Sequence, residues 1–445
     1  MSNDHQAYLA KRQLKRGTAG WILLAGLGVS YVISGDFAGW NFGIAQAGWA
    51  GFAIAAVLMG LMYLTLVLSL AEMSAAIPAA GGGYSFARQA MGPTGGFLTG
   101  LAVLIEYALA PAAIVIFIGS AVEALLGFNG PWVYAIFYLV FVGIHLAGVG
   151  EALKVMMVIS GLAVFAIVAT GGALILHFDI NNLFDIAMTD ANGASEMLPL
   201  GWYGVWAALP FAMWLFLAVE GVPLAAEEAK DPGKDVPKGI IGAMVFLLFT
   251  ALLVVVLVPG AAGAQAMGES AVPLVDALNA TGNASLATLV NVLGLAGLVA
   301  SFFSIIYGYS RLVFALSRAG YLPKSLSLTT ERKVPARALI VPGIFGFIAS
   351  LSGEGDLMQP ARRICRPVGE VVMLIAQAPG RRRVGHAHDH LTLGREQEFD
   401  EVERSLLVAR IRGQRHTRDV DVKALVITEG REDDFGLSSG LANSV

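Results

Sequence analysis

Three acidic residues lie inside long apolar stretches of this 445-residue chain, where a charge is costly. They are Asp36, Glu106 and Glu220. An ionisable group at the centre of a bilayer costs about 2.5–3.5 kcal/mol on insertion scales, and by default it marks a substrate or ion pathway. A carboxyl group in such a place can hold an ammonium group or carry a proton. These three residues are therefore the first candidates for chemistry.

Two of the acids adjoin sequences that break helices. Asp36 lies in the segment 34–39, SGDFAG, and Glu220 begins the segment 220–223, EGVP. Irregular backbone is tolerated in lipid only where it lines a cavity or is buried in protein. Interrupted helices at equivalent places in two halves of a chain are typical of a transporter binding site. The alternative is that these glycines only allow close helix packing.

Each acid also has a structural interpretation that the sequence leaves open. Asp36 could pair with a substrate ammonium group or cap the half-helix that follows it. Glu106 has no basic residue near its depth, so it faces a partner or a cavity, or it carries a proton. A proton relay and a hydrogen bond to a neighbouring helix both fit Glu106. Glu220 is either a proton-linked gate or a carboxylate bound to free amides of the break.

One aromatic residue joins these candidates. Trp214 lies six residues before Glu220 and could close over a bound cation, because aromatic faces attract ammonium groups. A lipid-facing or interfacial position is the alternative. His145 and His177 have no partners at ligand spacing, and the single cysteine, Cys365, excludes a cysteine zinc site. We therefore expect no metal and no cofactor, and no spacing of catalytic groups indicates an enzyme.

The elements that carry these residues are membrane spans. The chain is 56% hydrophobic and 14% charged, against about 25% charged residues in soluble domains. Its net charge of −4 gives no basis for a nucleic-acid partner. A span needs about 20 apolar residues. Nine stretches qualify or nearly so: 20–43, 50–73, 99–126, 131–146, 155–176, 205–224, 240–257, 286–316 and 338–351. The sequence therefore predicts an all-α polytopic membrane protein.

The basic residues test this span count, because Lys and Arg are retained on the cytoplasmic side during insertion. All 15 Lys and Arg residues of the segment 1–358 lie before span 1, after an even-numbered span, or at the end of span 8. We therefore expect a cytoplasmic N-terminus in the inner membrane of a bacterium. The first apolar stretch is too long for a signal peptide, so we interpret it as a retained span.

The composition changes near Met358. Residues 1–358 are about 10% charged and residues 359–445 are about 31% charged. The second segment carries 13 Arg on what would be the outer side, against the rule that holds before it. Its apolar stretch 371–378 is too short to span. We expect a cytoplasmic segment 1–17, a transmembrane domain 18–358, and an unrelated charged tail 359–445 that is disordered or derived from a frameshift.

Four ordered motifs resemble those of the amino acid–polyamine–organocation (APC) transporter superfamily. Residues 71–84, AEMSAAIPAAGGGY, resemble its signature between spans 2 and 3. Residues 216–221, FLAVEG, and 227–232, EEAKDP, resemble its span 6 and the following loop, and residues 309–323 contain YSR and SRAGYLP of its span 8 to 9 region. The resemblance covers about residues 10–358. It implies an inverted-repeat (LeuT-like) permease fold of two five-span halves, here truncated after about nine transmembrane helices.

The break in span 1 resembles one branch of this superfamily. Members commonly read GSGxF with an apolar residue at x, whereas residues 33–37 read ISGDF, and residues 34–41, SGDFAGWN, are similar to ethanolamine permeases. An acid at x would repel a substrate carboxylate and favour a plain amine. The resemblance implies that Asp36 binds the ammonium group and that Trp214 gates the site. The remaining site residues that it implies are Ser34, Gly35, Phe216, Glu220 and Gly221.

Together these patterns predict a secondary transporter that imports ethanolamine across the cytoplasmic membrane, with lipid around it. Glu106 and Glu220 are the candidates for coupling to protons, by symport or exchange. An amino acid permease or exchanger of the same superfamily is one alternative, and a membrane sensor or scaffold with a soluble tail is another. A tenth span should begin near Met358 and does not. We therefore expect this chain to transport poorly or not at all.

Overall fold

The computed structural model describes residue 17 and residues 19–77, 81–147 and 152–351. Within these ranges the chain is helical almost throughout, and its one strand-like contact is an isolated bridge between Ala19 and Ala229. Each of the nine predicted spans falls on helical segments, with interruptions in spans 1 and 6. In the described part of the chain, five helices are long and apolar enough to cross a membrane. The prediction of an all-α protein with several membrane helices is confirmed.

Spans 1 to 5 occupy the elements α2 to α7. Their bounds are α2 Trp21–Val32, α3 Ser34–Phe37, α4 Phe42–Ala76, α5 Gly83–Leu126, α6 Pro131–Ala147 and α7 Ala152–Leu174, followed by the short turns η1 Ile175–His177 and η2 Ile180–Phe184. α4 contains the end of span 1 and all of span 2, with a kink at Gly48, whose φ of 73° favours glycine. Gly92, with φ 79°, likewise kinks α5 near its start, before span 3.

Spans 6 to 9 occupy the elements α8 to α13. Their bounds are α8 Gly201–Met213, η3 Val219–Glu228, α9 Pro232–Ala262, α10 Ala264–Glu269, α11 Pro273–Ala280, α12 Ala284–Arg318, η4 Lys324–Ser327 and α13 Ala336–Leu351. Span 6 is divided into α8 and the 3₁₀ segment η3 by residues 214–218, which follow neither pattern. The predicted interruption of span 6 is therefore present.

Span 1 is interrupted over a longer stretch than predicted. The sequence places the break within residues 34–39, whereas the structure shows a first irregularity at Ile33, one helical turn in α3, and an irregular stretch from Ala38 to Asn41. Gly39 adopts φ 98° within this stretch. α4 begins after Asn41, and no side chain caps it. Asp36 therefore does not cap the following half-helix, and that alternative is wrong.

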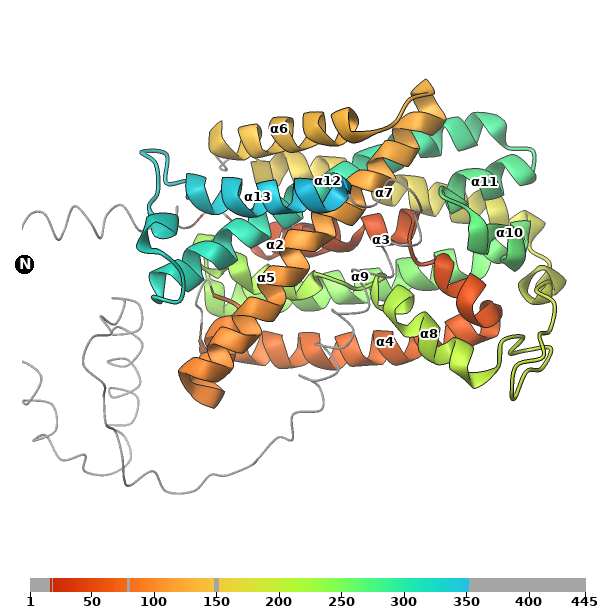
Figure 1. Ribbon diagram of the computed structural model, residues 1–445, viewed down its shortest axis with the longest axis horizontal. Helices are drawn as coiled ribbons and strands as arrows, with labels where there is room; N and C mark the ends of the chain where they lie inside the picture. Colours follow the sequence, from red (N-terminus) through yellow and green to blue (C-terminus); the bar gives the residue numbers. More distant parts are fainter. Residues whose placement is uncertain (1–16, 18, 78–80, 148–151, 352–445) are drawn as a thin grey trace, which may run out of the picture. The chain divides into compact units, whose positions relative to one another are not determined.

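The two interrupted spans lie among the long helices. α2 packs against α9 and α7, α4 packs against α8 and α9, and α12 packs against α5 and α7. Figure 1 shows α5 crossing the other long helices obliquely. α3 is seated on α12 through small residues, since a Cβ at Gly294 or Gly297 would lie 2.8 or 2.9 Å from the Phe37 ring. These contacts fix the position of the span 1 break.

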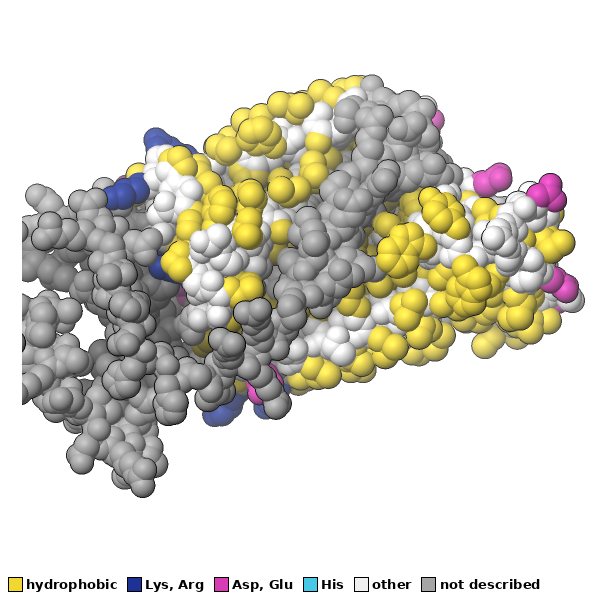
Figure 2. Space-filling model, turned by 60° about the horizontal axis from the view of Figure 1, so that its bottom comes forward, with side chains coloured by type: hydrophobic (Ala, Val, Ile, Leu, Met, Phe, Trp, Pro, Cys, Tyr) yellow, Lys and Arg dark blue, Asp and Glu magenta, His cyan; other side chains and the backbone are white. Residues whose placement is uncertain are grey.

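The surface of this domain has the pattern of a membrane protein. Large apolar side chains are exposed on its sides, among them Leu139, Leu176 and Leu252 at 74%, 85% and 65%. On the face that Figure 2 shows, the Lys and Arg side chains lie at one end of an apolar band, whereas Asp and Glu side chains are visible at both ends. One-sided basic residues are what the positive-inside rule predicts. The predictions for residues 1–16 and 359–445 lie outside the described residues.

Candidate functional site

The two interrupted spans touch each other at glycines of span 1. A Cβ at Gly35 would collide with the backbone carbonyl of Trp214, and a Cβ at Gly39 would lie 2.9 Å from the Trp214 indole nitrogen. Any larger side chain at Gly35 or Gly39 would push the two breaks apart. The structure thus brings together two segments that lie about 180 residues apart in the chain, as expected for interrupted helices in two halves of a transporter.

Asp36 is fully enclosed beside this contact. Its exposed fraction is 0%, and neither carboxylate oxygen has a hydrogen-bond partner among the described residues. The Thr250 hydroxyl of α9 lies close enough to act on the Asp36 carboxyl group, but it donates its proton to the carbonyl of Leu247. A buried carboxylate without a partner is unfavourable unless it meets a cation or takes up a proton. Asp36 can therefore accept hydrogen bonds from a small cation.

Trp214 is buried at the interface between the breaks. It is 6% exposed, and the Phe117 ring of α5 meets its indole edge-on with centroids 6.2 Å apart. The alternative of a lipid-facing Trp is therefore wrong. Its Nε1 has no acceptor among the residues described. A buried indole N–H usually has a hydrogen-bond partner, so this group can donate to an oxygen atom in the site.

Backbone amides at two of the predicted site positions are already used. The amide of Ser34 donates to the Ser301 hydroxyl of α12 at 3.0 Å, and the amide of Phe216 donates to the Met213 carbonyl at 3.0 Å. The Phe216 ring packs against the Tyr63 ring of α4 rather than toward span 1. These amides are consequently less able to bind a substrate carboxylate than the free amides that the resemblance implies.

A second acidic cluster joins span 3 to the second half of span 6. Glu106 of α5 and Glu220 of η3 are close enough to interact, and each has one oxygen without a partner in the described part of the chain. The Tyr107 hydroxyl donates to Glu220 Oε1 at 3.1 Å. Backbone amides of the same turn also lie near the Glu220 carboxylate. Glu106 thus faces a carboxyl partner, and two adjoining buried carboxyl groups can hold a shared proton.

Gly221, the other predicted residue of this break, makes room for the cluster. A Cβ at Gly221 would collide with the Tyr107 hydroxyl and lie 3.1 Å from the Tyr31 ring. On the opposite side, a Cβ at Gly308 of α12 would lie 2.9 Å from the Tyr31 hydroxyl. Two glycines therefore enclose two tyrosines from α2 and α5. The structure gives Gly221 a packing role next to Glu220.

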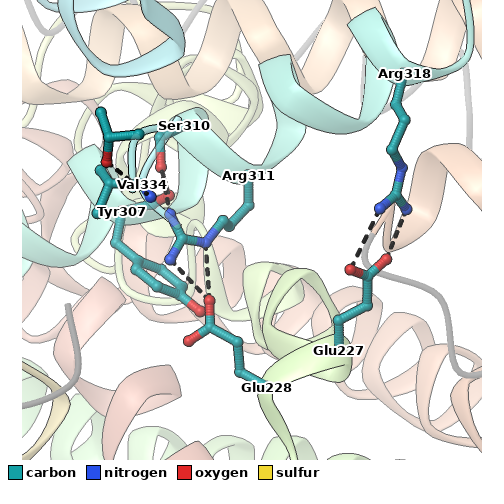
Figure 3. Close-up of polar contacts among 8 residues, drawn as sticks. Glu227, Glu228, Tyr307, Ser310, Arg311, Arg318 and Val334 are labelled. Carbon is teal, nitrogen blue, oxygen red and sulfur yellow. Dashed lines mark hydrogen bonds and ion pairs between the residues drawn. The ribbon is translucent and has the colours of Figure 1, made fainter. Parts of the chain in front are cut away.

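Two ion pairs join η3 to α12 (Figure 3). Arg311 donates from Nε and Nη2 to Glu228 Oε1 at 3.0 and 2.7 Å, and Arg318 donates to both carboxylate oxygens of Glu227. The Arg311 side chain is 3% exposed and stacks over the Tyr307 ring at 4.2 Å. The sequence analysis placed the two arginines in the topology test and all four residues in family motifs, but it did not pair them. Their signal is the spacing of seven residues between the arginines, which places both on one helix face, opposite adjacent glutamates.

Both ends of span 1 are tied to the second half of the chain. Near its start, the Ala19 amide donates to the Glu228 carbonyl at 3.0 Å, and the Lys230 amide donates to the Ala19 carbonyl at 2.8 Å. At its far end, Asn41 Nδ2 donates to the carbonyls of Met267 and Ser270. Both ends of span 1 are therefore fixed to segments that follow span 6. Among the residues that the structure describes, no group of three or more His, Cys, Asp or Glu could hold a metal ion.

Comparison with known proteins identifies the family. The amino acid permease family matches residues 21–358. This chain belongs to the amino acid permease family. The match ends where the sequence changes composition, so residues 359–445 lie outside it. Members of this family are transporters, and the permease is a secondary transporter with several membrane helices.

Relatives of this permease are identical to it at about a quarter to a third of the aligned positions. An uncharacterised transporter of Rhizobium meliloti is 31% identical over 323 residues, which cover 71% of this chain and 68% of the relative. The branched-chain amino acid permease BcaP of Bacillus subtilis is 25% identical, with 77% and 76% covered. The aromatic amino acid transport protein AroP of Escherichia coli O157:H7 is 26% identical, with 78% of each chain covered.

A solved structure confirms the class of fold. The substrate-bound, outward-open state of a Na⁺-coupled sialic acid symporter matches with a TM-score of 0.54 and 14% identity, over 83% of this chain and 84% of the symporter. At this identity the likeness concerns the fold alone. The permease therefore has the LeuT-like fold that the resemblance implies, whereas the truncation after nine spans stays a prediction.

Proposed function

We propose that the permease carries a small primary amine across the cytoplasmic membrane, and that the amine is ethanolamine. The observation that carries this proposal is Asp36, which is fully enclosed beside the meeting point of the two breaks and has no partner for either oxygen among the described residues. A substrate ammonium group would supply these hydrogen bonds. Charge-assisted hydrogen bonds of this kind are the stronger ones in proteins.

The surroundings of Asp36 favour a plain amine over an amino acid. A negative carboxylate in the break would repel the carboxylate of an amino acid, and the Ser34 and Phe216 amides are engaged elsewhere. The Trp214 indole N–H has no acceptor in the described part of the chain, and the hydroxyl oxygen of ethanolamine could accept from it. Ethanolamine matches both groups with its two polar ends.

Proton coupling is the second part of this proposal. Glu106 and Glu220 place two carboxyl groups close together where span 3 contacts span 6. Two negative charges repel each other at this distance, so such a pair favours holding one proton. We assign the N-terminal end of the domain to the cytoplasm, on the positive-inside rule. The proton and the amine would then be carried together or exchanged.

Direct binding to the purified 445-residue chain in detergent tests the substrate. We expect radiolabelled ethanolamine to bind and to be displaced by unlabelled ethanolamine but not by leucine or phenylalanine. Asp36→Asn should weaken binding roughly tenfold to a hundredfold, because a charge-assisted hydrogen bond is lost. Asp190→Asn, the same change at an exposed loop position, is the matched control. Unchanged affinity in Asp36→Asn would remove Asp36 from this role.

An amino acid substrate is the second candidate, because relatives of this chain are named as branched-chain and aromatic amino acid transporters. In the same experiment it predicts that leucine or phenylalanine binds and that ethanolamine does not compete. It also predicts that Asp36→Asn binds amino acids more tightly, since a repelling charge is removed.

A further inference from the structure

The Tyr107 hydroxyl lies between two acceptors on span 6. It is 3.1 Å from Glu220 Oε1 and 3.3 Å from the backbone carbonyl of Ala218. A phenol has a single O–H to donate, so it serves one acceptor fully at a time. A charged carboxylate attracts that proton more strongly than a peptide carbonyl does. The choice between the acceptors therefore depends on the charge of Glu220.

Ala218 is the strained point of the broken span. Its φ of 77° lies in the left-handed region, which alanine rarely adopts and which costs about 1–2 kcal/mol. It directly precedes η3 and ends the irregular residues 214–218. Such a conformation persists when surrounding contacts hold it. The hydrogen bond from Tyr107, which comes from another helix, is one of these contacts.

Few other ionisable groups act on Glu220. Its ionisable neighbours are Glu106 and Tyr107 of α5 and Tyr31 of α2. Arg311 of α12 and Glu228 of η3 act electrostatically on Tyr31. From α4, Tyr63 faces the Phe216 ring. The charged residues of α9 lie in its first two turns, where Lys234 is exposed and paired with Asp231. The charge that Tyr107 senses is thus mainly that of the Glu106–Glu220 pair.

We propose that Tyr107 is a positioning residue that transmits the charge of the Glu106–Glu220 pair to the substrate site. When Glu220 is charged, Tyr107 donates to its carboxylate and the Ala218 carbonyl loses this donor. When a proton from water is added and shared between the two carboxyl groups, Tyr107 donates to the Ala218 carbonyl and steadies residues 214–218. Trp214 begins this turn and touches Gly35 and Gly39 of span 1. Protonation thereby orders the side of the site that contacts span 1.

This inference rests on the proposed function in one respect, because it takes the carboxyl pair as the proton site. Its test needs no substrate. Hydrogen–deuterium exchange of peptides covering residues 214–221 in the full chain in detergent is measured in mildly acidic and mildly alkaline buffer, with rates corrected for intrinsic exchange. In the wild type we expect roughly three- to tenfold greater protection in acid, the effect of one hydrogen bond.

Two variants should fix the turn in opposite states. Tyr107→Phe removes the donor and should give low protection in both buffers. Glu220→Gln removes the charge and should give acid-level protection in both buffers. Tyr31→Phe is the matched control, because the Tyr31 hydroxyl lies beside Tyr107 but has no hydrogen-bond partner among the described residues. Tyr31→Phe should keep the wild-type difference between the buffers.

Three results would overturn the inference: a wild type without a pH response, a Tyr107→Phe variant that keeps the response, or a Tyr31→Phe variant that loses it. If Tyr107→Phe does not fold, low protection in Glu220→Gln overturns the inference by itself. Failure of ethanolamine to bind leaves these readouts intact, so the substrate proposal and this inference fail separately. If ethanolamine binds, its affinity should vary with pH in the wild type and not in Tyr107→Phe.

Discussion

Asp36 and Trp214 show how a buried polar group differs from a buried apolar one. Each is enclosed at the junction of two broken helices, and each has hydrogen-bonding capacity that no described residue uses. A protein that folds around such groups bears an energetic cost, which a ligand with matching groups offsets. At the scale of single residues, we therefore propose that specificity depends on unsatisfied atoms rather than on the walls of the candidate site.

The two parts of the Trp214 side chain should contribute separately to amine binding. Trp214→Phe keeps an aromatic face and loses the indole N–H, so ethanolamine affinity should fall roughly three- to tenfold. Ethylamine, which has no hydroxyl oxygen, should be nearly unaffected by this change. Trp214→Ala should weaken both ligands, because the ring face is also lost. Equilibrium binding of the two radiolabelled amines measures the difference, and equal losses for both in Trp214→Phe would contradict the hydroxyl contact.

The broken spans are the elements that form the candidate site, and glycines at their contact allow them to approach closely. Gly35→Ala would put a methyl group against the Trp214 carbonyl, which is backbone and cannot rotate away. We expect a loss of about 1–3 kcal/mol of stability and weaker ethanolamine binding, measured by thermal unfolding in detergent and by radioligand binding. Gly172→Ala in α7 is the control, since nothing lies within 4 Å of its Cβ position. Equal behaviour of the two variants would show that the breaks do not need this contact.

The helices could be predicted from the sequence because each span is a long apolar stretch. The two breaks could be predicted because Gly and Pro residues interrupt two of these stretches. The extent of the first break could not, since the sequence does not show that residues 34–37 make one helical turn before the chain leaves the helix at Ala38. Tyr107 was missed for a different reason. An aromatic residue in a span usually indicates packing, and only its two acceptors on another element reveal more.

For the whole molecule, the ion pairs between η3 and α12 should matter unequally. Glu228→Gln leaves Arg311 almost fully buried without its partner charge, which costs about 3–5 kcal/mol. Glu227→Gln should cost less, because its partner Arg318 is more exposed, at 14%. Thermal unfolding of both variants checks this order. The double variant Arg311→Met with Glu228→Leu should recover most of the stability that Glu228→Gln loses. If it does not, the contribution of the Arg311–Glu228 pair is not purely electrostatic.

The segment 359–445 leads to a prediction about transport. We propose that this segment supplies no tenth span, and that the lack of this span limits turnover rather than binding. Ethanolamine should bind in detergent, while uptake into proteoliposomes should be near that of empty vesicles. A chimaera that replaces this segment with the corresponding part of the Rhizobium meliloti relative should restore uptake. Rapid uptake by the 445-residue chain would refute this proposal.

Glu228 connects η3 to two other elements. Its main-chain carbonyl holds the start of span 1 through Ala19, and its side chain holds α12 through Arg311. A displacement of η3 that breaks one of these contacts also strains the other. Separating span 1 and α12 from η3 one at a time is therefore unfavourable. This end of the permease should therefore open cooperatively, and a half-open state that leaks protons or water would be rare.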